Sequence, residues 1–132
     1  MSGGENRQVN GEAQPPDEEM EKARDKLARA EEQLQRAERA WGDDGFVEAL
    51  KAKTPDEKGK AFRLKLEIGT KLLMIENAQI ALVASRVEEN SQEFESAITD
   101  LGDALQTLSN VTRVLNATGS LLSLVGRVVA IV

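Results

Sequence analysis

The chain of 132 residues contains no cysteine, no histidine and no tyrosine. The absence of cysteine excludes a disulfide framework and any thiolate site. The absence of cysteine and histidine together excludes Cys/His and Ser/His/Asp nucleophilic centres, the common zinc sites and the Glu-x-x-His signature of di-iron bundles. We therefore expect a protein that is not an enzyme and that holds no metal and no cofactor.

Other chemical signatures are also missing. The sequence has no glycine-rich phosphate loop of the form GxxxxGKS or GxxxxGKT. Its adjacent carboxylates, such as Glu31 with Glu32, would point about 100° apart on a helix, so they are not placed to share an acid–base task. The formal net charge of −6 argues against a broad nucleic-acid surface. No small-molecule substrate and no nucleic-acid partner is indicated.

Aromatic residues are scarce, and the four that occur are Trp41, Phe46, Phe62 and Phe94. Sheet-rich proteins depend on aromatic and β-branched residues, whereas Ala, Leu, Glu, Lys, Arg and Gln dominate here. This composition favours helices. The 40% hydrophobic content is enough for one buried core in a chain of this length. We expect Trp41, Phe46 and Phe62 to gather at one end of that core.

The N-terminal residues 1–17 contain Gly, Pro, Asn and Gln but almost no large apolar side chains. They cannot bury enough surface to offset the entropy of ordering, so we predict a disordered tail before a single domain at 18–132. A partner-binding role for this tail stays open. Because no apolar run marks a secretory signal peptide, we expect a cytoplasmic, intracellular protein.

The segment 18–41 has the pattern of a first helix. Met20, Leu27, Leu34 and Trp41 recur every seven residues, and a column of alanines accompanies them at 23, 30 and 37. This is a heptad with one large and one small column. After Gly42, Asp43 or Asp44 is placed to cap a short turn. Further on, "TPDE" at 54–57 has the residues of a capping box that starts the next helix.

A longer heptad follows. Ten positions at a seven-residue spacing are large and apolar: Leu66, Leu73, Ile80, Val87, Phe94, Leu101, Leu108, Leu115, Leu122 and Val129. From 61 to 84, apolar residues occupy nearly every side of a helix, which predicts neighbours on more than one side. From 92 to 115 they form a single stripe.

Two all-α architectures fit these columns. The first is an antiparallel bundle of three long helices with an optional short C-terminal fourth, over about 18–41, 55–89, 92–116 and 119–131. The second is a helical hairpin in which one very long coiled-coil helix runs through 61–116. The sequence "NATGS" at 116–120 is the expected stop and restart before the last helix.

The chain ends on the apolar segment "SLLSLVGRVVAIV". Residues 114–132 reach the lower range of membrane-spanning lengths. Arg127 lies within this segment, however, and neither end carries an aromatic belt or a basic cluster. We interpret the segment as a packing seam in a bundle or oligomer, with peripheral membrane contact as the open alternative.

The predicted function is that of a non-enzymatic helical interaction or assembly protein, which self-associates or docks a partner helix through its apolar heptad faces. The alternative is a membrane-acting helical module, such as a pore-forming or cell-death-type domain or its regulator, that uses the apolar C-terminal helix. Small residues there permit close helix contact. The candidate interaction residues are Leu101, Leu108, Leu115, Leu122, Val125, Val129, Gly119, Ser123 and Gly126.

Overall fold

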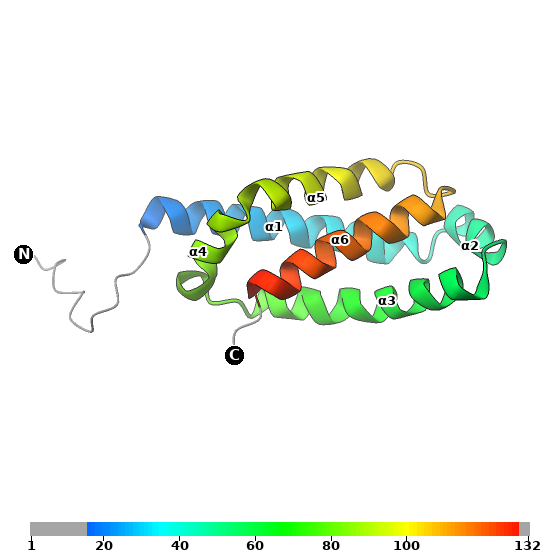
Figure 1. The fold of residues 1–132 in the computed structure, drawn as a ribbon, viewed down its shortest axis with the longest axis horizontal. Helices are drawn as coiled ribbons and strands as arrows, with labels where there is room; N and C mark the ends of the chain where they lie inside the picture. The colour runs from blue at the N-terminus through cyan, green and yellow to red at the C-terminus, as the bar shows by residue number, and fades with distance from the viewer. Residues whose placement is uncertain (1–15, 130–132) are drawn as a thin grey trace, which may run out of the picture.

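The computed structural model describes residues 16–129, and this part of the chain is helical without any strand. The predicted all-α class is therefore confirmed for these residues, while the predicted tail at 1–17 lies almost wholly outside them. The helices are α1 (Asp17–Ala40), α2 (Asp44–Lys51), α3 (Pro55–Glu76), α4 (Ile80–Glu89), α5 (Ser91–Ala104) and α6 (Val111–Val129) (Figure 1).

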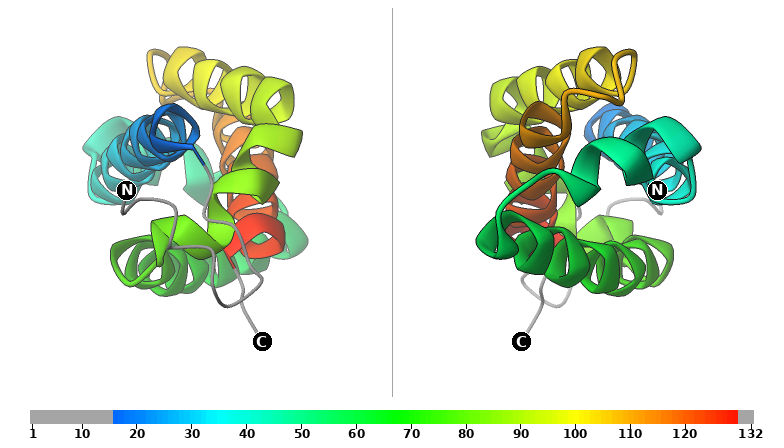
Figure 2. Two further views of the ribbon diagram at one scale, coloured as in Figure 1. Left: turned by 90° about the vertical axis from the view of Figure 1, so that its left-hand side faces the viewer. Right: turned by 90° about the vertical axis from the view of Figure 1, so that its right-hand side faces the viewer.

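Four of these helices form the sides of a bundle. α1 packs against α3 and α5, and α6 packs against α3 and α5 on the opposite side (Figure 2). The chain runs in one direction along α1 and α5 and in the other along α3 and α6 (Figure 1). The two short helices close the ends, with α2 between α1 and α3 at one end and α4 against α1 at the other. The predicted count of three long helices with a short fourth is not what the structure has.

The predicted helix 55–89 is divided in two. α3 ends at Glu76, the backbone N–H of Asn77 donates to the carbonyls of Leu73 and Ile75, and α4 begins at Ile80. Asparagine favours helix ends because its side chain competes for backbone hydrogen bonds. The heptad column runs from Leu73 to Ile80 across this break without a change of phase, so periodicity alone concealed it.

The predicted boundary between the last two helices is also displaced. α5 ends at Ala104, residues 105–110 form a connection, and α6 then continues unbroken from Val111 through "NATGS". Gly119 does not end the helix, because buried residues on both sides of it hold α6 in the bundle and tertiary packing overrides local propensity. These breaks also exclude one continuous helix over 61–116.

The predicted starts of α2 and α3 are confirmed by their hydrogen bonds. The side chain of Thr54 accepts a hydrogen bond from the backbone N–H of Glu57, and Pro55 occupies the first turn of α3. The carboxylate of Asp43 accepts from the backbone N–H groups of Gly45 and Phe46 at the start of α2. Local side-chain chemistry thus sets where both helices begin.

The aromatic cluster forms only in part. The rings of Trp41 and Phe46 lie 4.8 Å apart between centroids, and the indole Nε1–H of Trp41 donates to the carbonyl of Ala61 at 3.0 Å. This contact ties the end of α1 to the start of α3. The prediction that Phe62 joins them is wrong, because Phe62 lies on the other side of α3 and is 62% exposed.

Candidate functional site

Most of the predicted interaction residues lie inside the bundle. Leu101, Leu115, Leu122, Val125 and Val129 are buried among residues of their own chain, and Leu108 is half-buried against the same core. In the described fold these side chains therefore complete the core of one molecule. Their part in an assembly stays a prediction.

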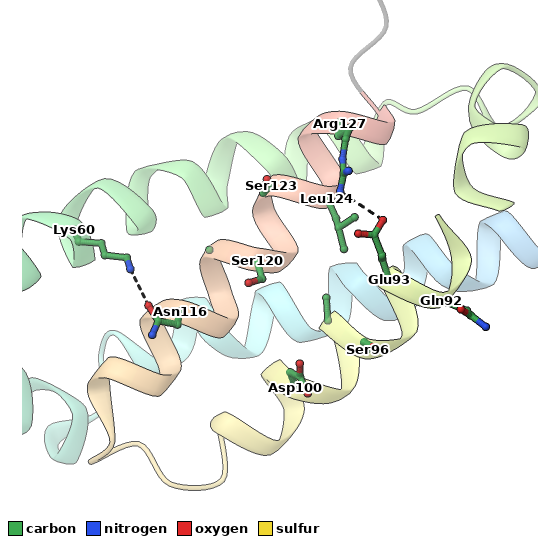
Figure 3. A pocket seen from close by; sticks show the side chains of 12 residues that line it. Lys60, Gln92, Glu93, Ser96, Asp100, Asn116, Ser120, Ser123, Leu124 and Arg127 are labelled. Atoms are coloured by element: carbon green, nitrogen blue, oxygen red, sulfur yellow. Dashed lines mark hydrogen bonds and ion pairs between the residues drawn. The ribbon is translucent and has the colours of Figure 1, made fainter. Parts of the chain in front are cut away.

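The predicted interaction residues that are small, namely Gly119, Ser123 and Gly126, lie around a polar groove of about 870 Å³ between α5 and α6 (Figure 3). Gly119 and Ser123 line it, while the Cβ position at Gly126 lies 2.9 Å from Cε of Lys71. The exposed Arg127 forms a 3.7 Å ion pair with Glu93 across the groove. Lys60 donates to the Oδ1 of Asn116 at 2.9 Å.

This groove does not concentrate any chemistry. The remaining lining residues are Gln92, Ser96, Ala97, Asp100, Ser120 and Leu124. Its charged side chains are exposed or half-exposed, which is the ordinary state of surface charge. Neither an apolar anchor pocket nor a buried polar group marks it as a binding site within residues 16–129.

A cluster of charges joins α1 to α5. Glu95 accepts hydrogen bonds from Arg29 at 2.6 and 2.9 Å and from Lys26 at 2.7 Å. These bonds from Arg29 and then Lys26 lower the pKa of Glu95 to about 2. The same bond raises the pKa of Arg29. A carboxylate with this lowered pKa stays ionised near neutral pH, and its hydrogen bonds connect α5 to α1.

Two further properties of residues 16–129 bear on function. No group of three or more acidic side chains there is placed to hold a metal ion. None of the helices in this part of the chain combines the length and the hydropathy that crossing a bilayer requires.

The outer side of α3 carries an unusual concentration of exposed apolar side chains. Within residues 16–129, the large apolar residues that lie more than half exposed are Phe62, Leu66, Leu73 and Leu82, at 62%, 60%, 58% and 54%. The first three lie within about 40° of one another around the axis of α3. We call the stripe of Gly59, Phe62, Leu66, Gly69 and Leu73 the α3 face. Leu82 of α4 continues it at one end.

α3 is apolar on two sides, and only one side is covered. Its inner residues, Ala61, Leu64, Ile68, Leu72 and Ile75, are buried against α1 and α6. The sequence predicted neighbours on more than one side of this segment, and the described chain supplies them on one side alone. Where α3 meets α4, a groove of about 630 Å³ opens beside Leu73, with Met74, Leu82 and Val129 among its lining residues.

Gly69 lies in the middle of this uncovered stripe. A Cβ built at this position would meet no other atom within 4 Å. A glycine in a helix interior costs roughly 1 kcal/mol relative to alanine. Packing within the described chain therefore gives no reason for a glycine here. A second glycine of the face, Gly59, would place a Cβ 3.4 Å from the flexible guanidinium of Arg63.

Sequence reasoning missed this face although the signal was present. The ten-member column includes Leu66 and Leu73, and the position between them is Gly69. A small residue within an apolar helical stripe permits close helix contact. Comparison with known proteins gave no matching family model, no matching curated protein and no matching solved structure. Any statement of function therefore rests on the residues of this chain.

Proposed function

We propose that the protein is a non-enzymatic helical interaction protein and that the α3 face is its docking surface for another helix. The single observation that carries this proposal is the combination of three exposed large apolar side chains with an unpacked glycine on one stripe. Each feature is unfavourable in an isolated molecule. Both become favourable once a second helix covers the stripe.

The energetic reason lies in the buried area. Covering a large aliphatic or aromatic side chain completely is worth about 1.5–3 kcal/mol. Phe62, Leu66 and Leu73 are each more than half exposed. Covering them therefore gains a substantial part of this free energy for each of the three side chains. Contiguous exposed apolar patches on a folded surface mark interaction sites more often than scattered single residues do.

The geometric reason lies in Gly69. A glycine on a helix surface lets the backbone of a second helix approach closely, and a large side chain of that helix can occupy the space above it. Close packing of a second helix against Gly69 would offset the helix stability that the glycine costs. The membrane-acting alternative relies on α6 residues, and their burial in the bundle leaves it without a supporting observation.

Site-specific photo-crosslinking tests the docking surface. A benzoylphenylalanine at Thr70, which is exposed beside Gly69, is compared with the same probe at Gln35, which is exposed on α1. We expect protein adducts from Thr70 in the native host, and a decrease of about tenfold or more when Leu66→Gln and Leu73→Gln are introduced together. Equal yields from the two probes, or adducts that survive the double substitution, would contradict the proposal.

A further inference from the structure

We propose that the occupant of the α3 face is the α3 face of a second copy of this chain, bound antiparallel about a two-fold axis. This inference rests on the docking function proposed above and specifies its partner. A symmetric dimer requires a surface that is complementary to itself. The α3 face meets this requirement in both the size and the charge of its residues.

Size complementarity fixes the register. The positions Gly59, Phe62, Leu66, Gly69 and Leu73 alternate in steps of three and four, which is the spacing of a heptad seam, and the next position in that spacing is the charged Glu76. When two such seams run antiparallel about an axis between Glu67 and Ile68, Leu66 of each copy lies opposite Gly69 of the other. The Leu66 side chain of each copy therefore fills the gap above Gly69 of the other copy. In the same register, Phe62 lies opposite Leu73.

A parallel arrangement lacks this complementarity. It would place Gly69 against Gly69 and leave an unfilled space at the centre of the seam. It would also pair Leu66 with Leu66 and Phe62 with Phe62, so that no large side chain lies opposite Gly69. Packing without voids therefore favours the antiparallel pair.

The charges beside the face point the same way. The exposed basic residues Lys58, Arg63 and Lys65 flank its N-terminal half, and the exposed acidic residue Glu76 follows Leu73 at its C-terminal end. The antiparallel register places Lys58 of one copy beside Glu76 of the other, twice by symmetry. The parallel register places Lys58 beside Arg63 of the other copy, and like charges at such positions are unfavourable.

The expected dimer is weak. α3 has 22 residues, which gives a contact of about 33 Å at most. One helix from each copy buries an area at the low end of specific interfaces, so we expect a dissociation constant on the order of micromolar. The protein should therefore change mass with concentration within an accessible range.

Sedimentation equilibrium of the full chain tests the partner. We expect the mass to rise from the 14.4 kDa monomer towards twice that value as concentration increases. Gly69→Gln, and Leu66→Gln with Leu73→Gln, should each weaken the dimer by about tenfold or more. The matched control Ala28→Gln, exposed on α1, should dimerise like the unmodified chain. Circular dichroism and urea unfolding verify that each variant remains folded.

Introduced cysteines test the direction, because the natural chain has none and any disulfide must arise from the pair introduced. Gly59 and Glu76 are 17 residues apart, or about 26 Å along a helix. A disulfide requires Cα atoms within about 7 Å. We expect Gly59→Cys mixed with Glu76→Cys to crosslink, and each variant alone to stay monomeric under denaturing conditions.

The outcomes separate this inference from the function on which it rests. Crosslinks within Gly59→Cys alone and Glu76→Cys alone would show a parallel pair and overturn the proposed register. A folded protein that stays monomeric at every concentration, yet still gives Thr70 adducts with another protein or with vesicle lipid, would overturn the second copy as occupant. Absence of any association through Thr70 would remove the docking function itself.

Discussion

Gly69 is an exposed residue in the interior of α3 with open space where its Cβ would lie. Gly69→Ala should raise the free energy of unfolding of the monomer by about 0.5–1 kcal/mol, because alanine loses less backbone entropy in a helix. The matched control is Gly102→Ala in α5, where a Cβ would lie at an ordinary 3.5 Å from the Oε1 of Gln33. Urea unfolding at low protein concentration measures both.

Equal stabilisation by these two substitutions would show that the fold of one molecule does not need a glycine at position 69. A loss of stability at Gly69→Ala, with a gain at Gly102→Ala, would show that it does. In that case the glycine would no longer support a docking role.

Thr118 is the one polar residue that is buried in the part of the chain that the structure describes. Its hydroxyl is fully buried, and no hydrogen-bond partner for it lies within residues 16–129. Burying an unpaired hydroxyl costs about 1–3 kcal/mol. Thr118→Val keeps the shape and removes the hydroxyl, so we expect the free energy of unfolding to rise by about 1 kcal/mol. A decrease in thermal and urea stability would show that the hydroxyl has a partner in solution.

At the scale of the elements, Glu95 holds α5 against α1 through Arg29 and Lys26. Its pKa falls from 4.5 to about 2 on folding. A lowered carboxyl pKa stabilises the folded state above pH 4.5 and loses that effect as the pH falls towards 2. Because the Glu95 side chain is 44% exposed, solvent screening reduces the gain to about 0.5–1 kcal/mol.

Glu95→Gln should therefore lower the free energy of unfolding by about 0.5–1 kcal/mol at pH 7. The deficit should shrink as the pH falls from about 4.5 towards 2, because the natural carboxyl then becomes protonated. The control Glu93→Gln removes only the exposed 3.7 Å pair with Arg127 and should have a smaller effect. A deficit that does not change with pH would assign the effect to packing and not to charge.

The element boundaries show what a sequence can predict. The starts of α2 and α3 could be predicted because Asp43 and Thr54 set them through local hydrogen bonds. The break after Glu76 could not, because Leu73 and Ile80 keep the heptad phase across it. The continuity of α6 through Gly119 could not either, because it depends on packing against α3 and α5.

At the scale of the whole molecule, the all-α class followed from composition and periodicity, while the candidate site did not. Periodicity shows that a position is apolar, but it does not show which neighbour covers it. Leu101, Leu115 and Leu122 were predicted to contact a partner and are covered by their own chain. Leu66 and Leu73 belong to the same column, and their position on the outside of the bundle leaves them uncovered.

A concentration series of ¹H–¹⁵N NMR spectra of the full chain tests the central claim most directly, because it locates association residue by residue. We predict that the concentration-dependent amide shifts gather on α3 from Lys58 to Glu76 and at the start of α4. In the Leu66→Gln and Leu73→Gln double variant, these shifts should appear only at concentrations about tenfold higher or more. Shifts concentrated along the α5–α6 groove at Gly119 and Ser123, or no shifts at any concentration, would contradict the association of two copies through the α3 face.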